Sequence, residues 1–103
     1  MSARHNITYP TTLVLHAIAN GVRYGFDIAD RTGLQTGTVY PALRRLESLG
    51  FVRSSWENDK IARREQRPAR RYYEITREGG DALAVALKRF ENLGRLRPGT
   101  RHA

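Results

Sequence analysis

Arginine side chains gather in one short segment of this sequence, KIARREQRPARR at residues 60–71. The segment holds six of the chain's 18 Lys and Arg residues, opposed locally by Glu65: Lys60, Arg63, Arg64, Arg67, Arg70 and Arg71. Guanidinium groups bind phosphates bidentately, and an arginine also fits the narrow minor groove of a duplex. We therefore expect Lys60, Arg63, Arg64, Arg67 and Arg70 to contact a polyanion from a flexible loop. The alternative, a solvated charged loop, explains the polarity of the segment but not its shortage of acids.

A second set of polar side chains lies on a helix expected from Thr36 to Leu49. Its apolar residues share one stripe at 100° per residue: Val39, Ala42, Leu43 and Leu46. The opposite side presents Gly37, Tyr40, Pro41, Arg44 and Ser48. Such a helix fits a DNA major groove about 12 Å wide, which is read mainly near the helix N-terminus. The candidate groove-reading residues are Gln35, Thr36, Gly37, Thr38, Tyr40, Arg44 and Arg45. The alternative is an ordinary solvent-exposed helix face.

No set of residues has a spacing suited to catalysis or to metal binding. His5, His16 and His102 lie in different expected elements, so they form neither a metal site nor a nucleophile-base pair. The pair Gly79-Gly80 opens a helix but lacks the context of a phosphate-binding loop. Cysteine is absent, which excludes disulfides and thiolate metal sites. These observations predict a protein that is not an enzyme and that uses no cofactor.

Composition points to a small basic protein with a polyanionic partner. The 103 residues are enough for one domain with a modest core, and the net charge of +8 favours nucleic acid. No apolar run reaches the roughly 20 residues of a membrane span, and the N-terminus lacks the apolar core of a signal peptide. We expect a cytoplasmic, nucleoid-associated location.

The expected elements follow the order helix, helix, helix, strand, strand, helix. The first helix lies in TYPTTLVLHAIANG with Thr8 or Thr11 as its cap, and the second lies in YGFDIADRTG, ended by Gly33. After the helix at residues 36–49, FVRSSWEN and RRYYEIT read as the two strands of a hairpin. Thr76 then caps a last helix that Gly94 ends. This order predicts a mainly α fold with a small β-hairpin, a winged helix-turn-helix.

Four segments are expected. They are a flexible N-terminus at 1–8, a winged helix-turn-helix DNA-binding domain at 9–76, a C-terminal dimerisation helix at 77–93 and a flexible basic tail at 94–103. The last helix carries an apolar stripe that is more extensive than the edge of a small domain requires: Leu83, Ala86, Leu87, Phe90 and Leu93. We expect this stripe to form a homodimer, because a dimer reads two half-sites. The alternative is that it covers the first helix of its own chain.

Several motifs resemble a known family when they are taken together. YGFDIADRTG, GTVYPALRRLESLGFV, SSWE and RRYYEIT-x-x-G look like the PadR family of bacterial transcriptional regulators, over roughly residues 10 to 90. The resemblance implies a winged-helix repressor that binds a palindromic operator as a homodimer, in the short subfamily without a separate C-terminal domain. Where members commonly read Ser-Pro-Gly-Thr, this sequence has Gln35-Thr36-Gly37-Thr38, so Thr36 is expected to substitute for the missing Ser cap.

The resemblance also implies a small aromatic effector, since some PadR-like proteins bind phenolic acids or flat drugs. Trp56, Tyr73 and Phe90 are the residues that would line such a pocket. The simpler interpretation is that Trp56 and Tyr73 pack the hairpin onto the helices.

Two other functions fit the same fold, an RNA-binding domain and a protein-interaction module. RNA readers usually expose several aromatic stacking platforms, whereas Tyr40 is the single outward aromatic expected on the helix at 36–49. A protein-interaction module would not need the arginines of residues 60–71. The sequence therefore favours a homodimeric repressor that binds a double-stranded DNA operator.

Overall fold

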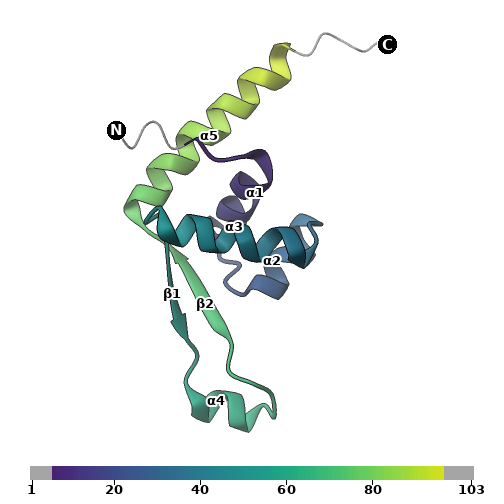
Figure 1. Cartoon of the computed structure of the whole chain (residues 1–103), viewed down its shortest axis with the longest axis vertical. Coiled ribbons are helices and arrows are strands. Elements are labelled where there is room, and N and C mark those ends of the chain that lie inside the picture. Colours follow the sequence, from purple (N-terminus) through teal and green to yellow (C-terminus); the bar gives the residue numbers. More distant parts are fainter. Residues whose placement is uncertain (1–5, 97–103) are drawn as a thin grey trace.

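The structure, a computed structural model, describes the backbone of residues 6–96 and the side chains of residues 6–92. Its helices are α1 (Tyr9–Ala19), α2 (Gly25–Thr32), α3 (Thr36–Ser48), α4 (Asp59–Arg64) and α5 (Arg77–Leu96), and its strands are β1 (Val52–Trp56) and β2 (Arg71–Ile75). In Figure 1, α1, α2 and α3 form a helical body from which the β1–β2 hairpin extends at one end and α5 at the other. The predicted winged helix-turn-helix is confirmed. Of the two segments predicted to be flexible, 1–8 and 94–103, residues 1–5 and 97–103 lie outside the described residues.

Helix α1 begins after Thr8, one of its two predicted caps. The hydroxyl of Thr8 accepts a hydrogen bond from the Thr11 N–H at 3.3 Å, and Pro10 lies in the first turn, where its missing N–H is not needed. The preceding residue, Ile7, is only 2% exposed, and its carbonyl accepts a hydrogen bond from Arg89 of α5. The predicted flexibility of residues 1–8 is therefore wrong at Ile7, because burial and this hydrogen bond fix it.

The core of the body confirms the stripe predicted on α3. Its apolar residues Val39, Ala42, Leu43 and Leu46 are all buried among side chains of α1 and α2. After α3, Gly50 adopts a left-handed φ of 80°, and the Phe51 N–H donates to the Leu46 carbonyl at 2.9 Å. This turn directs the chain from α3 straight into β1.

The hairpin pairs β1 with β2 in antiparallel register, with Val52 opposite Ile75 and Trp56 opposite Arg71. Two contacts hold it to the helical body beside α2: Tyr24 forms an isolated bridge with Tyr72, and the Tyr73 N–H donates to the Arg23 carbonyl at 2.9 Å. The hairpin is thus fixed to the body at Tyr72 and Tyr73 of β2, and its far end extends away (Figure 1).

The far end of the hairpin, residues 57–70, contains a helix that the sequence did not predict. The Asn58 side chain caps α4 by accepting from the Lys60 N–H at 2.7 Å, and Ala62 is 4% exposed. Residues 59–69 were predicted to be a flexible loop, which is wrong for the six residues of α4. We call residues 57–70 the wing tip.

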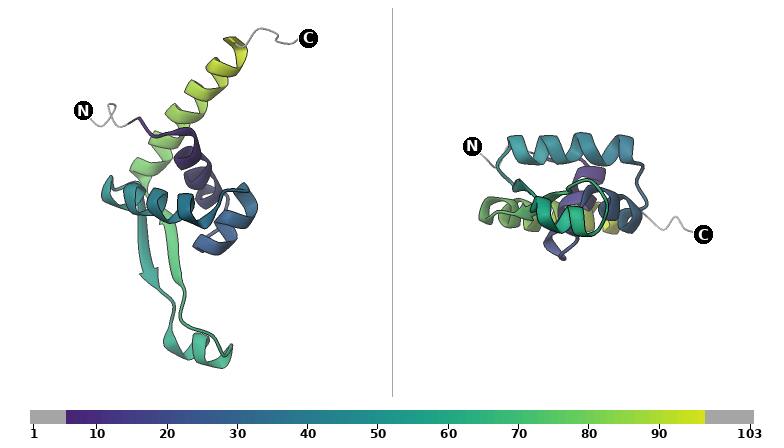
Figure 2. Two further views of the ribbon diagram at one scale, coloured as in Figure 1. Left: turned by 45° about the vertical axis from the view of Figure 1, so that its right-hand side comes forward. Right: turned by 90° about the horizontal axis from the view of Figure 1, so that it is seen from below.

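Helix α5 begins against the first strand and then leaves the body. Thr76 caps it as predicted, accepting from the Gly79 N–H at 3.0 Å. A Cβ on Gly79 would lie 2.0 Å from the Phe51 carbonyl oxygen, so only glycine allows this approach. The helix continues through Gly94 to Leu96, past its predicted end, and projects beyond α1 (Figure 2). Within the described residues, no helix is long and apolar enough to cross a membrane.

Candidate nucleic-acid interface

The N-terminus of α3 opens to solvent without a side-chain cap. Gln35 occupies the cap position in an extended conformation, and its side chain makes no capping hydrogen bond. Thr36 is the first helical residue, so the prediction that it substitutes for a Ser cap is wrong. Thr36, Gly37 and Thr38 are all exposed. Uncapped first-turn N–H groups at the positive end of a helix dipole are suited to binding a phosphate.

Tyr40 lies one turn further along α3, and α2 fixes its position. Its ring rests on Gly25 so closely that a Cβ there would lie 2.5 Å from Tyr40 Cε1 and 2.7 Å from the hydroxyl oxygen. The side chain is still 40% exposed. Tyr40 therefore presents its outer edge to solvent from a supported position, as a phosphate-binding tyrosine requires.

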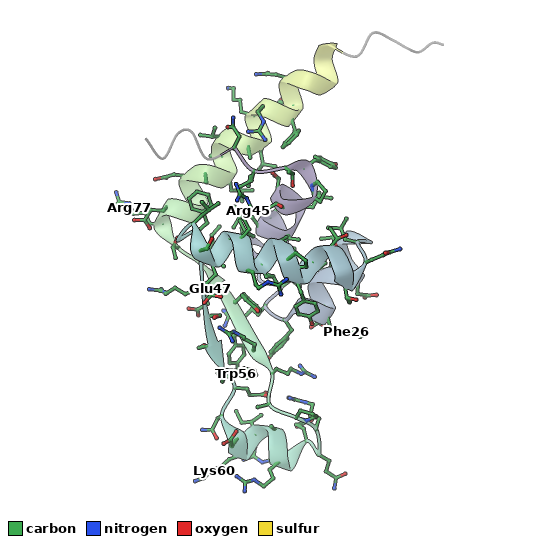
Figure 3. All side chains as sticks on the ribbon, viewed as in Figure 1. Phe26, Arg45, Glu47, Trp56, Lys60 and Arg77 are labelled. Atoms are coloured by element: carbon green, nitrogen blue, oxygen red, sulfur yellow. The ribbon has the colours of Figure 1, made fainter. Side chains whose placement is uncertain are left out.

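Arg44 and Arg45 add two cations to the exposed surface of α3. Neither has a carboxylate within 4.0 Å among the described side chains. The nearby acid Glu47 is engaged with the hairpin, where its Oε2 accepts from the Ser54 hydroxyl at 2.6 Å. In Figure 3, Glu47 lies toward the hairpin and Arg45 lies on the opposite flank of α3. The positive charge of Arg44 and Arg45 is thus available to a ligand.

The wing tip is organised around a buried carboxylate. Glu57 is 5% exposed and receives both guanidinium nitrogens of Arg67, at 2.6 and 2.8 Å, together with the Arg70 N–H at 3.2 Å. The hydrogen bond from Arg67 is the main reason that the pKa of Glu57 falls from 4.5 to about 2. Sequence reasoning had placed Glu65 alone against the basic cluster and had missed Glu57. Arg67 is therefore neutralised by Glu57, and its structural role is to hold the two sides of the wing tip together.

The remaining cations of the wing tip are exposed. Lys60, Arg63 and Arg64 all lie on α4, and Arg70 stacks over the Tyr24 ring with its Cζ 4.5 Å from the centroid. No carboxylate of the described residues forms an ion pair with any of these four. Four of the five predicted wing residues are thus free to contact phosphates.

A protein-family model matches the part of the chain that carries both of these surfaces. The Transcriptional regulator PadR-like family matches residues 14–85, from α1 into α5, and includes both α3 and the wing tip. The chain belongs to the PadR-like family. This confirms the resemblance inferred from the motifs, and it makes the protein a PadR-like transcriptional regulator.

Solved structures share the PadR-like fold. A PadR family transcription regulator from Clostridium difficile R20291 is 26% identical, with a TM-score of 0.74 over 86% of this chain and 94% of that chain. A transcriptional regulator from Clostridium thermocellum is 25% identical, with a TM-score of 0.70 and 85% of each chain covered. PcaV from Streptomyces coelicolor, solved with its natural ligand, shares the fold at 19% identity, with a TM-score of 0.77 over 96% of this chain and 66% of PcaV. These three are transcriptional regulators rather than enzymes. No curated protein matches the sequence significantly.

The three aromatic residues predicted to line an effector pocket do not come together. Tyr73 is 7% exposed and packs in the core, as the simpler interpretation required, whereas Trp56 is 64% exposed on β1. Phe90 lies on α5, against Tyr9 with ring centroids 5.1 Å apart. The predicted trio is wrong because the hairpin and α5 leave the body of this PadR-like chain at different ends (Figure 1).

The residues predicted to form a dimer divide into two groups. Leu83 and Ala86 are 8% and 2% exposed and pack in the chain's own core, as the alternative interpretation held. Phe90 is half-buried, whereas Leu87 is 40% exposed. The side chain of Leu93 lies outside the described side chains. Val85, which the sequence analysis did not select, is 62% exposed on another side of α5.

Sequence reasoning also missed Phe26. It lies in the first turn of α2 and is 73% exposed (Figure 3). In α2, Ile28 is buried and Ala29 is partly buried against the core, whereas Phe26 lies beside the polar Asp27. The position of Phe26 outside this buried face was the signal that would have placed it on the surface of α2.

Proposed function

We propose that this PadR-like regulator is a sequence-specific, homodimeric repressor that places α3 in the major groove of a palindromic operator. The observation that supports it most strongly is the surface of α3. The helix has an uncapped N-terminus, a glycine that allows close backbone approach and two unpaired arginines, all opposite a fully buried stripe. The basic wing tip extends away from α3, where it would contact phosphates outside the groove (Figure 2).

The test of α3 uses two exposed residues. Tyr40→Ala and Arg44→Ala should weaken operator binding while thermal stability stays nearly constant, and loss of a base-reading arginine typically costs about 1–3 kcal/mol. DNA fragments selected by the wild-type protein would supply the operator, and fluorescence anisotropy would supply the affinities. Arg53→Ala is the matched control, because Arg53 is an exposed arginine on β1. Wild-type affinity of both α3 variants would refute the role of α3.

The dimer would form through α5 and the surface beside it. A groove of about 390 Å³ lies between α5 and the N-terminal segment, and Ile7, Phe51, Ala82 and Val85 are among its lining residues. With the exposed Val85 and Leu87, it gives α5 an apolar surface suited to a second copy of the chain.

Light scattering tests this interface. Leu87→Asp and Val85→Asp should each shift the protein toward monomer, because a buried unpaired carboxylate is costly. Ile61→Asp is a matched control, since Ile61 is 38% exposed at the wing tip, close to the 40% of Leu87. A wild type that stays monomeric at micromolar concentration would rule out the dimer.

A further inference from the structure

Phe26 is the most exposed of the large apolar side chains that the structure describes, at 73%. It lies in the first turn of α2 and does not belong to the hydrophobic core or to the residues packed against it (Figure 3). Its ring therefore contributes little to the stability of the fold. Single exposed apolar residues are common on protein surfaces, so the surroundings of Phe26 decide whether it has a role.

Those surroundings belong to α3. Phe26 lines a groove of about 530 Å³ together with Gln35, Thr36 and Gly37, at the start of α3. It also lines a second groove, of about 590 Å³, together with Tyr40, one turn further along the same helix. Phe26 is thus shared by both grooves and lies next to the residues proposed to enter the major groove of DNA.

Gly37 leaves space for a partner beside Phe26. It is not among the described glycines with a positive φ, and a Cβ added to it would meet nothing within 4 Å. Neither the backbone conformation nor packing within the chain requires glycine here, and alanine would favour the helix. The groove that Gly37 shares with Phe26 is therefore open where α3 begins. A base edge that approaches the start of α3 would come against the Phe26 ring.

The chemistry of the phenyl ring determines the kind of contact. It has no hydrogen-bond donor, so it cannot bind a phosphate as Tyr40 can. An aspartate also lines each groove, Asp30 the first and Asp27 the second, and a carboxylate repels a phosphate. The apolar group in the major groove of DNA is the 5-methyl group of thymine, and Phe is one of the side chains that contact it. Thymine is therefore the base whose edge fits this position.

We propose that Phe26 is a specificity-determining residue that contacts the 5-methyl group of one thymine in each half-site of the operator. The inference rests on the function proposed above, because the contact requires α3 in the major groove. It adds a residue from α2 that recognises an apolar group, whereas the polar side chains of α3 recognise hydrogen-bond donors and acceptors. The sequence preference of the regulator then depends on both helices.

The experiment removes the methyl group from the DNA. Replacing thymine by deoxyuridine deletes the 5-methyl group and leaves the hydrogen-bonding groups of the base pair in place. An operator selected by the wild-type protein is synthesised with deoxyuridine at one thymine position at a time, in both half-sites together, and fluorescence anisotropy measures the affinity. At one position the wild type should bind about tenfold more weakly or worse, since burial of one methyl group corresponds to about fourfold in each half-site.

Three variants assign this loss to a side chain. Phe26→Ala should bind the thymine and deoxyuridine operators with nearly equal affinity, because no ring remains to contact the methyl group. Phe26→Leu keeps an apolar side chain and should retain most of the difference. Trp56→Ala is the matched control and should retain the full difference, since Trp56 is 64% exposed on β1 and does not line the groove at the start of α3. Thermal unfolding should show that all three variants fold, because both side chains lie outside the core.

The outcomes separate this inference from the function on which it rests. If the wild type binds an operator and no deoxyuridine position lowers its affinity, the role of Phe26 is wrong and the repressor function stands. The same conclusion follows if Phe26→Ala and the wild type lose equal affinity at the same position. A general loss of affinity by Phe26→Ala without a methyl effect would place the ring against deoxyribose and would also overturn the inference. If the wild type selects no duplex at all, the proposed function and the role of Phe26 both fail.

Discussion

The two surfaces proposed to contact DNA, α3 and the wing tip, are held in place by different forces. Helix α3 is anchored by four apolar side chains that are each at most 6% exposed in the shared core. The wing tip depends on the ion pair between Glu57 and Arg67, the cap from Asn58 and the burial of Ala62. Its short helix α4 lies away from the main core (Figure 1).

This difference separates global from local stability. Apolar burial in α3 is shared with α1 and α2, so its loss destabilises the whole fold. The ion pair acts within ten residues of chain, so its loss would release the wing tip and leave the body folded. The surface proposed to read bases thus has the stability of the whole domain, while the surface proposed to contact phosphates can be ordered or released independently.

The largest expected effect is on the α3 side of this comparison. Leu46→Ala removes a side chain with 0% exposure and should lower the free energy of unfolding by about 2–5 kcal/mol. Chemical denaturation followed by circular dichroism would measure it, with Ser48→Ala, on the exposed side of the same helix, as the control. If the substitution destabilised α3 alone and left the other helices as stable as in the wild type, the claim that α3 shares the stability of the whole fold would be wrong.

A smaller, local effect is expected from Glu57→Gln. The substitution removes the charge that holds Arg67, so the amides of α4 should lose hydrogen-exchange protection while those of α1 and α3 keep theirs. Glu65→Gln is the matched control because Glu65 is an exposed wing-tip carboxylate that makes no ion pair within 4.0 Å among the described residues. Unchanged protection in α4 would show that the ion pair does not order the wing tip.

Acid provides a third way to separate the two surfaces. The pKa of Glu57 is lowered from 4.5 to about 2, so its stabilising effect is fully present above pH 4.5 and is lost as the pH falls from 4.5 toward 2. The α4 resonances should therefore change in this range in the wild type, and Glu57→Gln should abolish that change. NMR spectra across the pH series would measure it. A wild-type transition identical to that of Glu57→Gln would contradict the assignment.

The smallest expected effect distinguishes two arginines of the wing tip. Arg64 is exposed and unpaired among the described residues, so Arg64→Ala should reduce the slope of log affinity against log salt by about 0.9 for each phosphate that is no longer neutralised, or nearly 2 in a dimer. Arg67→Ala should instead act by releasing the wing tip, which would reduce hydrogen-exchange protection in α4. Affinities for operator and random duplex across a salt series would measure the slope. A selective loss of operator binding by Arg64→Ala at constant slope would indicate base readout.

The pattern of apolar residues in the sequence was sufficient to predict the helices of the body and the two strands of the hairpin. Val39, Ala42, Leu43 and Leu46 recur with the helical period, and such a repeat specifies which face is buried. The charge of Glu57 carries no comparable signal, because its partner lies ten residues away across a turn that only the fold defines. The same limit explains why α4 was not predicted. This helix has six residues and is stabilised by one side-chain cap and one buried alanine, so it is too short to show a helical repeat of apolar residues.

The surfaces near the ends of the fold were harder to predict for a different reason. An apolar stripe on the last helix is equally consistent with the chain's own core and with a partner, and the structure assigns Leu83 and Ala86 to the core. Aromatic residues are similarly ambiguous. Composition does not reveal that Phe90 lies on α5 and Trp56 on β1, two elements that extend from different ends of the helical body (Figure 1). Tertiary geometry, which local pattern does not contain, decides both cases.

The close approach of Gly79 to the Phe51 carbonyl has a mechanical consequence. This contact packs the first turn of α5 directly against the segment that leads from α3 into β1. The position of α5 is therefore closely coupled to the positions of α3 and β1. A 20-residue helix is about 30 Å long, and a rotation of about 5° at its base moves its far end by roughly 2–3 Å. If two copies associate through α5, the Gly79–Phe51 contact is the point about which α5 turns relative to the body. Small changes in its angle would then alter the distance between the paired α3 helices, and with it the half-site spacing that the dimer accepts.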